Sequence, residues 1–552
     1  MPETKAYYCV FAIGPVQSFI AASRKLEDLW GGSYLLSFLV QSTLKTLTPI
    51  CRNHGVQKEL LYPALEERSK ADSSRLAIAN FPNRLTFTLI GNEEPVQNVM
   101  QALQHHALGE LIRISNWVVD EVFDTGSPSA KDRTGRLKLQ AEEQVKQFLE
   151  VNWIAHRISS KEDWDGERQE AERLFQAIKV QRPIKSFPEK GIACTVYQRM
   201  DALCDKDPLP TDRYGQLKSK LMDTWGNRHY TYKPSDPQNP DKARIRDNEF
   251  LCAISLIRRV ARDFFMHEYE VGSDVFSRYE SVVDLGAEED GYYAVLLMDG
   301  DNMGQFFSGS QEIVRSTSQK LSYFATNQVP DIVSGNKGVL LYAGGDDVLA
   351  IFPVNNVLPA AYQLRMAFSD DAVGLLGATA SAGIAIGHKR TPLQQMLTEA
   401  RSLEQAAKHY AADGANGMNK NAFALSVLPR SGEYLGSIVL PWTKNEVSVT
   451  GQLSEMAELL GAVVSTAFIY QLASTFQGLI GSAPDQEPEH LEEMVRLECC
   501  RLIDRAVYDV TLKKELQITV SRLPELYRQV GLKKFIDLLK MTAFFSRKEM
   551  KA

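Results

Sequence analysis

The fold is predicted from one stretch of sequence, Val339-Leu340-Leu341-Tyr342-Ala343-Gly344-Gly345-Asp346-Asp347-Val348-Leu349-Ala350-Ile351-Phe352. Two apolar runs flank Gly-Gly-Asp-Asp, which is the pattern of a β-hairpin whose turn carries two carboxylates. Upstream, the apolar run Tyr293–Met298 stops at Asp299-Gly300-Asp301, so a second acidic cluster lies at a strand end. The sequence therefore places acids at the ends of two separate strands.

These acids predict a metal site if the two strand ends meet. Carboxylates about 4 Å apart repel each other by roughly 4 kcal/mol at an effective dielectric of about 20, and a divalent cation removes that repulsion. The nearby donors are all oxygens, which favours Mg²⁺ or Mn²⁺ over zinc. The alternative is an ordinary hairpin, in which glycine supplies a positive φ and aspartate accepts hydrogen bonds from turn amides. Asp299 favours the metal site, because an apolar strand seldom ends in acids without a bound cation.

The segment around the hairpin follows a β-α-β-β-α-β order, which is typical of a ferredoxin-like, palm-type domain. In chain order, the predicted elements are a strand at 293–298, a helix at 311–328, the hairpin, a helix at 359–368 and a strand at 378–387. Apolar residues from Leu393 to Tyr410 then recur at helical spacing. Lys408 lies in the last turn of that helix, where it either complements the helix dipole or clamps a triphosphate.

A second unit of similar design is predicted at the start of the chain. Tyr8–Ile13 is predicted to be a strand, and Gly14-Pro15 a turn into a helix. The runs Arg75–Ala79 and Arg84–Ile90 predict a palm hairpin without acids. A duplicated palm in which one copy keeps its carboxylates suggests an active site between the halves, with the first copy holding nucleotide.

Trp30-Gly31-Gly32-Ser33 is predicted to break the helical pattern before a further helix begins. Gly31, Gly32 and Ser33 would suit a contact with phosphate or ribose at a helix start. A plain N-cap is the alternative.

We therefore predict an α+β fold with two ferredoxin-like palm domains, related to GGDEF and polymerase palms, plus helical domains. The predicted domains are 1–118, a non-catalytic first palm; 119–280, mostly helical with a degenerate cysteine cluster; 281–430, the second palm with the Gly-Gly-Asp-Asp motif; and 431–552, helical.

Composition restricts the classes of function. The 552 residues carry a formal net charge of −7, which argues against a free-standing nucleic-acid binder. Any nucleic acid is expected to be held mainly by partner proteins. Seven cysteines without paired spacing favour a reducing cytoplasm. The N-terminus lacks a secretory signal profile, and the uncharged stretch 459–484 is too polar for a membrane span.

Several motifs together resemble the large subunit of type III-B CRISPR effector complexes, the Cas-ten family of Cmr type. The resemblance covers nearly the whole sequence. The motifs, in order, are Gly14-Pro15-Val16-Gln17-Ser18-Phe19-Ile20, Trp30-Gly31-Gly32-Ser33-Tyr34-Leu35-Leu36-Ser37, Phe81-Pro82-Asn83-Arg84, Asp299-Gly300-Asp301-Asn302-Met303-Gly304, the acidic hairpin, and Ala380-Ser381-Ala382-Gly383-Ile384-Ala385-Ile386-Gly387-His388.

The resemblance implies an enzyme of antiviral defense that converts ATP into cyclic oligoadenylate messengers when guide RNA pairs with an invading transcript. The implied partners are the other type III-B subunits, the guide RNA and the target RNA. Two rivals remain open: another palm-type cyclase or polymerase, and an architectural subunit of the ribonucleoprotein without catalysis.

The sequence departs from this family in two places. Many relatives carry an HD nuclease domain before the first palm, but no His-Asp dipeptide occurs here, so HD-type DNase activity is expected to be absent or supplied by another chain. The resemblance implies zinc held by two Cys-x-x-Cys pairs, of which only Cys194 and Cys252 are kept in this sequence. This erosion weakens the expectation of zinc.

The predicted mechanism uses two Mg²⁺ or Mn²⁺ ions held by Asp299, Asp346 and Asp347, with ATP as substrate and pyrophosphate as leaving group. Asp301 is a weaker candidate, because it can instead cap the following turn. The residues predicted to bind nucleotide are Gly344, Gly345, Gly300, Lys408, Gly32 and Ser33.

Overall fold

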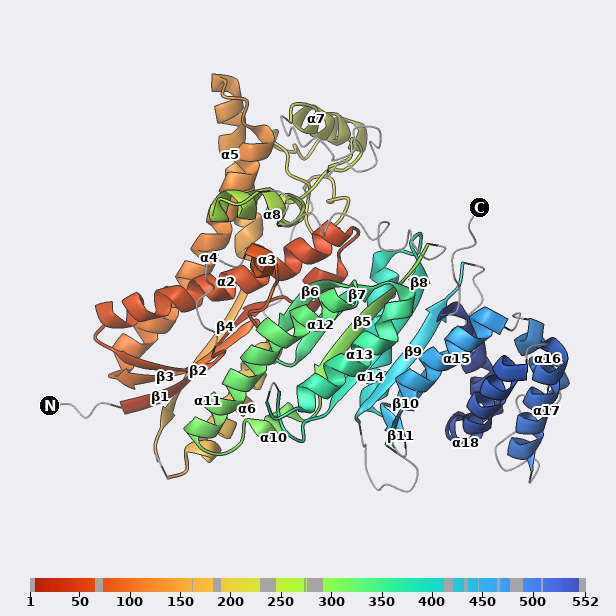
Figure 1. Cartoon of the computed structure of the whole chain (residues 1–552). Coiled ribbons are helices and arrows are strands. Elements are labelled where there is room, and N and C mark those ends of the chain that lie inside the picture. The colour runs from red at the N-terminus through yellow and green to blue at the C-terminus, as the bar shows by residue number, and fades with distance from the viewer. Residues whose placement is uncertain are drawn as a thin grey trace. The chain divides into compact units, whose positions relative to one another are not determined.

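Two β-sheets organise the chain, and both contain the strand order of a ferredoxin-like domain (Figure 1). The computed structural model describes residues 5–64, 73–160, 162–181, 190–228, 245–272, 275, 291–372, 374–411, 420–430, 435–444, 446–463, 467–476, 490–507 and 510–545. The chain divides into two compact units. The first holds Met1–Glu280, Gly304–Ser322 and Leu341–Gly345, and the second holds Ser281–Met303, Tyr323–Leu340 and Asp346–Ala552.

The first unit contains a four-stranded antiparallel sheet in the order β2-β3-β1-β4. Its strands are β1 (Lys5–Gly14), β2 (Gln57–Tyr62), β3 (Arg84–Gly91) and β4 (Glu150–Ile158). Helix α2 (Leu26–Asn53) lies between β1 and β2 in the chain, and α4 (Glu93–Phe123) lies between β3 and β4. This β-α-β-β-α-β order confirms a palm-type first domain. Strand β4 lies past residue 118, within the range predicted to be mostly helical, and the four domain boundaries stay a prediction.

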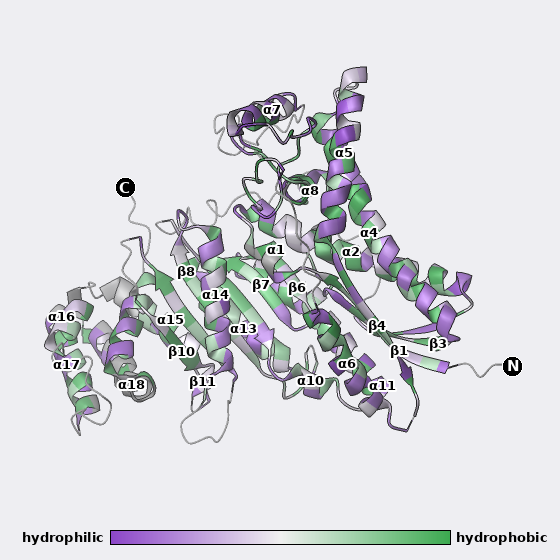
Figure 2. Ribbon diagram, turned by 180° about the vertical axis from the view of Figure 1, so that it is seen from behind, coloured by the Kyte–Doolittle hydropathy of each residue, from purple (hydrophilic) through white to green (hydrophobic). Residues whose placement is uncertain are grey.

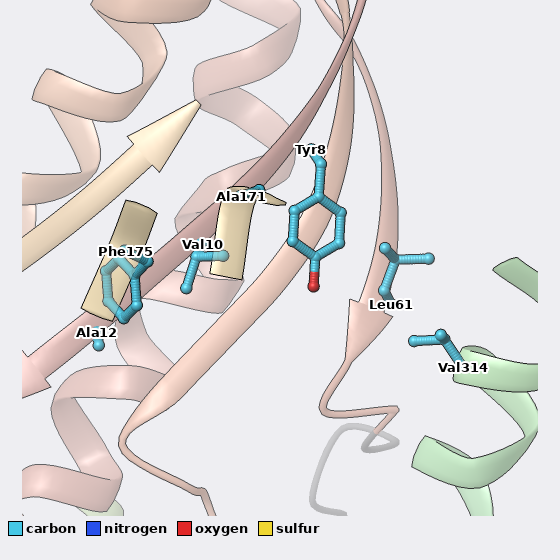
Figure 3. Close-up of a cluster of buried hydrophobic side chains, with 7 residues drawn as sticks. All are labelled: Tyr8, Val10, Ala12, Leu61, Ala171, Phe175 and Val314. Carbon is cyan, nitrogen blue, oxygen red and sulfur yellow. The ribbon is translucent and has the colours of Figure 1, made fainter. Parts of the chain in front are cut away.

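Both faces of the first sheet are covered. On one face, Tyr8, Val10 and Ala12 of β1 form a buried cluster with residues of β2, α6 (Trp164–Val180) and α11 (Gln311–Tyr323). The further members of this cluster are Leu61, Ala171, Phe175 and Val314 (Figure 3). The alternating residues Cys9 and Phe11 are fully buried on the opposite face.

The predicted helix break at Trp30-Gly31-Gly32-Ser33 is wrong, because these residues lie inside α2. A Cβ atom on Gly31 would lie 2.6 Å from the carbonyl oxygen of Arg258 in α8 (Ala253–Tyr269). The glycines therefore allow two helices to pack closely, and that tertiary contact outweighs their low helix propensity. Gly32 and Ser33 are buried in this helix. Their contact with nucleotide stays a prediction. It was based on a helix start at these residues, and the helix in fact begins earlier, at Leu26.

Of the two strands predicted for the hairpin of the first palm, one is confirmed and the other is wrong. Strand β3 confirms the run at 84–90, but its hairpin partner is β2, and Ser73–Leu76 forms the short helix α3. The carbonyl oxygens of Leu76 and Ala77 accept hydrogen bonds from Tyr34 Oη (2.6 Å) and Trp30 Nε1 (2.8 Å). Side chains of α2 therefore hold the carbonyls of Leu76 and Ala77, and the carbonyl of Ala79 accepts a hydrogen bond from the Ala343 amide (2.9 Å).

The second unit is built around a six-stranded sheet in the order β10-β9-β8-β5-β7-β6. Its strands are β5 (Tyr292–Gly300), β6 (Val339–Gly344), β7 (Asp347–Phe352), β8 (Ala380–His388), β9 (Ala422–Leu428) and β10 (Ser437–Pro441). Central β5 pairs antiparallel with β7 and β8, and β8 pairs parallel with β9. The predicted α+β class with a second ferredoxin-like palm is confirmed.

Helices pack on both faces of this sheet. Helices α12 (Val329–Gly335) and α13 (Val354–Ser369) lie on the face seen in Figure 1. Helix α14 (Leu393–Lys408) lies in front of the hydrophobic strands in the reverse view of Figure 2. The predicted helices at 311–328 and 359–368 are confirmed, and a π-helical turn at Phe324–Gln328 joins α11 to α12.

Glycine in β8 sets how closely α14 approaches the sheet. A Cβ atom on Gly383 would collide with the carbonyl oxygen of Ala400 and lie 2.5 Å from the amide nitrogen of Glu404. We expect Gly383→Ala to lower the free energy of unfolding by about 1–3 kcal/mol, because the backbone of α14 must move away. Urea denaturation measures this loss. Gly335→Ala is the matched control, since a Cβ atom there meets nothing within 4 Å. Equal stability of the two variants would contradict the close approach.

The remaining elements extend the two units. In the first unit these are α1 (Gln17–Ala21), α5 (Pro128–Phe148) and α7 (Tyr214–Gly226). After β10 the second unit continues with β11 (Thr443–Lys444), β12 (Val447–Ser448), α15 (Val449–Val463), α16 (Ala467–Thr475), α17 (Leu491–Ala506) and α18 (Val510–Phe545). The short helix α10 (Met303–Phe306) follows β5. Helix α18 is kinked at Gly531, whose φ is 76°.

Candidate active site

The acidic hairpin forms as predicted. Strand β6 ends at Gly344 and β7 begins at Asp347, so Gly345 and Asp346 are the two turn residues. Gly345 has a φ of 73°. Glycine with positive φ at the first central position is typical of a type II′ turn. The hairpin itself thus requires this glycine, and the predicted contact of Gly344 and Gly345 with nucleotide stays a prediction.

The acids of β5 and β7 lie on neighbouring strands at the same end of the sheet. The antiparallel ladder pairs Met298 with Val348, and extending this register by one residue places Asp299 opposite Asp347. Side chains at directly opposed positions share a face, with Cβ atoms about 4.5–5.5 Å apart. Asp346 sits beside Gly300: its Cβ atom is 2.9 Å from where a Cβ atom on Gly300 would lie. Gly300 therefore leaves room for Asp346.

Negative charge at this strand end is only partly neutralised. Asp347 is exposed and Asp346 is half-buried. Desolvation by the surrounding protein raises the pKa of both carboxyls, and the neighbouring charge of Asp347 raises the pKa of Asp346 further. Among the described residues, neither carboxylate has an ion-pair partner. A bound cation would stabilise such a group of carboxylates, because it removes the repulsion between their negative charges.

Lys408 supplies one positive charge at this place. Its Nζ atom forms an ion pair with Asp299 Oδ2 and lies 3.1 Å from Glu404 Oε1, one turn earlier on α14. Burial, together with the nearby charge of Lys420, lowers the pKa of Lys408 to about 8. The structure therefore brings Lys408 to the predicted acidic cluster, in contact with one of its three aspartates.

Glu404 was missed by the sequence analysis. It is buried on the face of α14 that packs against the sheet, and desolvation, with the charges of Asp347 and Asp301, raises the pKa of its carboxyl to about 7. The only sequence signal was its spacing, since residues four apart on a helix are neighbours. Glu404 makes the site more acidic than the three predicted residues alone.

Asp301 has a structural position. Its side chain is buried and accepts hydrogen bonds from Thr379 Oγ1 (2.8 Å), Ser381 Oγ (2.8 Å) and the Asn421 amide (3.0 Å). These bonds tie the end of β5 to the start of β8 and to the residue just before β9. Asp301 thus fixes the strand end that carries Asp299, in line with its weaker candidacy as a ligand.

The donor set suits a hard divalent cation, although it is not assembled as a closed cage. In the part of the chain that the structure describes, no three His, Cys, Asp or Glu side chains converge closely enough to hold a metal ion. The available ligands are carboxylate oxygens on adjacent strands, in a region of excess negative charge. Mg²⁺ characteristically binds through one or two carboxylates and completes its shell with water and substrate phosphates. The residues therefore fit Mg²⁺ or Mn²⁺.

Cys194 and Cys252 lie together in the first unit. The Sγ atoms of Cys194 and Cys252 are 3.3 and 3.4 Å from Ser255 Oγ. Burial opposes ionisation of Cys194, but hydrogen bonds involving Cys252 and Ser255 outweigh it and lower the pKa of the Cys194 thiol to about 6. The amide of Tyr197 also donates to Cys194 Sγ, at 3.3 Å.

This cysteine frame does not fit zinc. A Cys₄ zinc site built from two Cys-x-x-Cys pairs needs four thiolates, and here Tyr197 and Ser255 stand at the second position of each pair. Among the residues that the structure describes, two thiols and one hydroxyl meet here, which leaves the tetrahedron incomplete.

Restoring two thiols is expected to create a zinc site. The double substitution Tyr197→Cys with Ser255→Cys should bind about one zinc per chain, because it completes a Cys₄ set. Elemental analysis of the purified protein, with and without a chelator wash, measures the metal. Thr195→Cys with Ser255→Cys is the control, since it adds as many thiols but places one of them at 195 instead of the paired position 197. One zinc per chain in the unaltered protein would contradict the poor fit.

Two family models match the chain. The model described as Cas10/Cmr2, second palm domain, matches residues 292–423. The model described as CRISPR-associated protein Cmr2, N-terminal, matches residues 8–115. The first of these segments contains Asp299, Asp346, Asp347 and Lys408. Among the described residues, no helix combines the length and apolar character needed to cross a membrane.

Known proteins similar to the chain agree with these matches. The CRISPR system Cmr subunit Cmr2 of Pyrococcus furiosus is 26% identical over 588 residues, which cover 83% of this chain and 65% of that protein. The chain thus spans less than two thirds of the length of this relative.

Solved structures show the same fold. A type III-B Cmr-beta complex in the apo state contains a chain with a TM-score of 0.61 at 13% identity, covering 96% of this chain and 82% of that chain. The same type of complex bound to cognate target RNA gives a TM-score of 0.57 at 14% identity, covering 92% of this chain and 79% of that chain. At these identities the likeness concerns the fold alone.

Proposed function

We propose that this chain, which belongs to the Cas10/Cmr2 family, joins ATP molecules into cyclic oligoadenylates at the acidic strand end of its second palm. The observation that supports this most is the register of the β5–β7 ladder, whose next opposed positions are Asp299 and Asp347, together with the close approach of Asp346 to Gly300. In the proposed reaction, a ribose 3′-hydroxyl oxygen forms a bond to the α-phosphorus of another nucleotide, and pyrophosphate leaves. The proton of the hydroxyl passes to a base in the site or to water.

Each residue of the site would have a separate role in this reaction. Asp299, Asp346 and Asp347 would hold Mg²⁺ or Mn²⁺, which when bound lowers the pKa of a coordinated hydroxyl and neutralises phosphate charge. Lys408 would contact the phosphates from the end of α14. Asp301 would keep the end of β5 in place through its buried hydrogen bonds. The tight turn at Gly345 would keep the hairpin tip free of bulky side chains.

We also propose that the chain works in the cytoplasm within a type III-B ribonucleoprotein, with the other subunits, guide RNA and target RNA as partners. The Pyrococcus furiosus relative is a Cmr subunit, and one structure of similar fold is a Cmr-beta complex bound to target RNA. With a net charge of −7, this chain is expected to leave most phosphate contacts to its partners. Target RNA would then act as the activator.

Mass spectrometry tests this function. The assembled complex is incubated with ATP, Mg²⁺ or Mn²⁺, and matching target RNA, and nucleotide products are identified. We expect cyclic oligoadenylates and pyrophosphate, in amounts that fall when the target RNA or the metal is left out. If other cyclic nucleotides form, the chain is a different palm-type cyclase. If no product forms under any condition, the chain is an architectural subunit.

A further inference from the structure

The ammonium group of Lys408 occupies a position in the acidic site that a metal cation could also take. It extends from the last turn of α14, and its Nζ atom contacts Asp299 and Glu404 together. The Lys408 and Asp299 side chains are 26% and 24% exposed, so water screens this pair less than it screens a surface pair. The contact takes up Asp299 Oδ2, one of the few oxygens in this cluster that could bind a metal ion.

The three aspartates are therefore not equivalent. Asp299 is neutralised by Lys408, whereas Asp346 and Asp347 have no ion-pair partner among the described residues. The single positive charge is tethered by its own helix, and Glu404 holds it from four residues away. When Lys408 leaves Asp299, it can keep Glu404 as a partner.

We propose that Lys408 competes with the divalent cation for Asp299, so that the site binds metal weakly until phosphate attracts the lysine away. The inference rests on the proposed function, because it assumes that Asp299 is a metal ligand. A triphosphate offers Lys408 more negative charge than one carboxylate does. Lys408 thus pairs first with Asp299 and then with the triphosphate. Nucleotide binding and metal binding are therefore coupled. Glu404 is the positioning residue that keeps Lys408 within reach of both.

The competition is tested by metal binding rather than by activity. Mn²⁺ alone is titrated into the full chain without nucleotide, and free Mn²⁺ is measured by electron paramagnetic resonance. We expect Lys408→Met to tighten Mn²⁺ binding about tenfold, which corresponds to about 1.4 kcal/mol. Lys408→Arg, which keeps the charge, should leave the affinity within about twofold of the parent. Lys408→Gln replaces the methionine variant if that variant does not fold.

Two further variants test whether the change in Mn²⁺ affinity arises from the contact between Lys408 and Asp299. Lys420→Met is the matched control: Lys420 is also a nearby lysine, but its Nζ donates to Asn302 Oδ1 at 2.8 Å. Removing its charge should change Mn²⁺ affinity much less than removing that of Lys408. Adding Asp299→Asn to Lys408→Met should abolish the gain, because the oxygen that the lysine released is then gone.

The possible results separate the two proposals. If Lys408→Met binds Mn²⁺ no more tightly than the parent, the competition is refuted, while the proposed function stands on the binding that the parent shows. If neither protein binds Mn²⁺ at millimolar concentration, both the competition and the metal-dependent function are refuted. A tenfold gain that survives Asp299→Asn also refutes the competition, because the lysine then acts elsewhere.

Discussion

Replacing Asp346 and Asp347 by asparagine is expected to lower the rate of ATP conversion by the assembled complex about a thousandfold, equivalent to about 4 kcal/mol of transition-state stabilisation. Asparagine keeps the size of aspartate but removes the charge that holds a divalent cation. The backbone of the hairpin should persist, because the turn depends on Gly345, whose φ is 73°. Quantifying cyclic oligoadenylates by mass spectrometry at saturating Mg²⁺ and target RNA gives the rate.

Stability distinguishes this effect from unfolding. Desolvation raises the pKa of both carboxyls in the folded chain, so their charged forms are disfavoured there. Their removal should leave the melting temperature unchanged or higher. Asp370→Asn with Asp371→Asn is the matched control, since it neutralises two adjacent, exposed aspartates after α13 and should keep full activity. A double variant at 346 and 347 that retains activity would rule out these residues as the metal-binding acids.

The second palm was predictable because its sequence signals are local. Apolar runs of five or six residues end abruptly at Asp299 and at the glycines of the hairpin, so strand ends could be read from the chain. Helical spacing from Leu393 onward placed Lys408 in a last turn, and α14 does end there. The strand order followed from the β-α-β-β-α-β pattern, for which few arrangements are possible.

The failed predictions depend on contacts between segments distant in sequence. Gly31 and Gly32 look like a helix break, but they are needed where α8 packs on α2. Glu404 looks like one half of an ordinary i, i+4 pair. It becomes part of the site only because β5 and β7 bring Asp347 and Asp301 towards the same helix. Propensity and spacing describe one segment at a time, so neither can predict contacts between segments that are distant in sequence.

Replacing Asp28 by alanine is expected to cost the first unit about 3–5 kcal/mol of unfolding free energy, the usual loss when one partner of a buried ion pair is removed. Asp28 is 1% exposed and accepts two hydrogen bonds from Arg259, at Oδ1 from Nε (2.7 Å) and at Oδ2 from Nη2 (3.1 Å). Arg259 in turn donates to Glu249 Oε2 at 2.7 Å. The substitution leaves the Arg259 guanidinium buried beside α2 with one carboxylate fewer. Urea denaturation at pH 7 measures the loss.

The same pair predicts how this loss depends on pH. Burial alone would raise the pKa of Asp28, but Arg259 and Arg258 outweigh it and hold the pKa below its ordinary value. The contribution of Asp28 is therefore fully present above its unfolded pKa of about 3.9 and is lost as pH falls through the lower folded value. The difference between parent and variant should shrink once the pH drops below about 4. Glu110→Ala is the control, because its pair with Arg113 (2.9 Å) lies at the surface and should contribute at most about 1 kcal/mol. An Asp28→Ala loss no larger than that of Glu110→Ala would mean that packing of α2 against α8, and not the buried charge pair, holds these helices together.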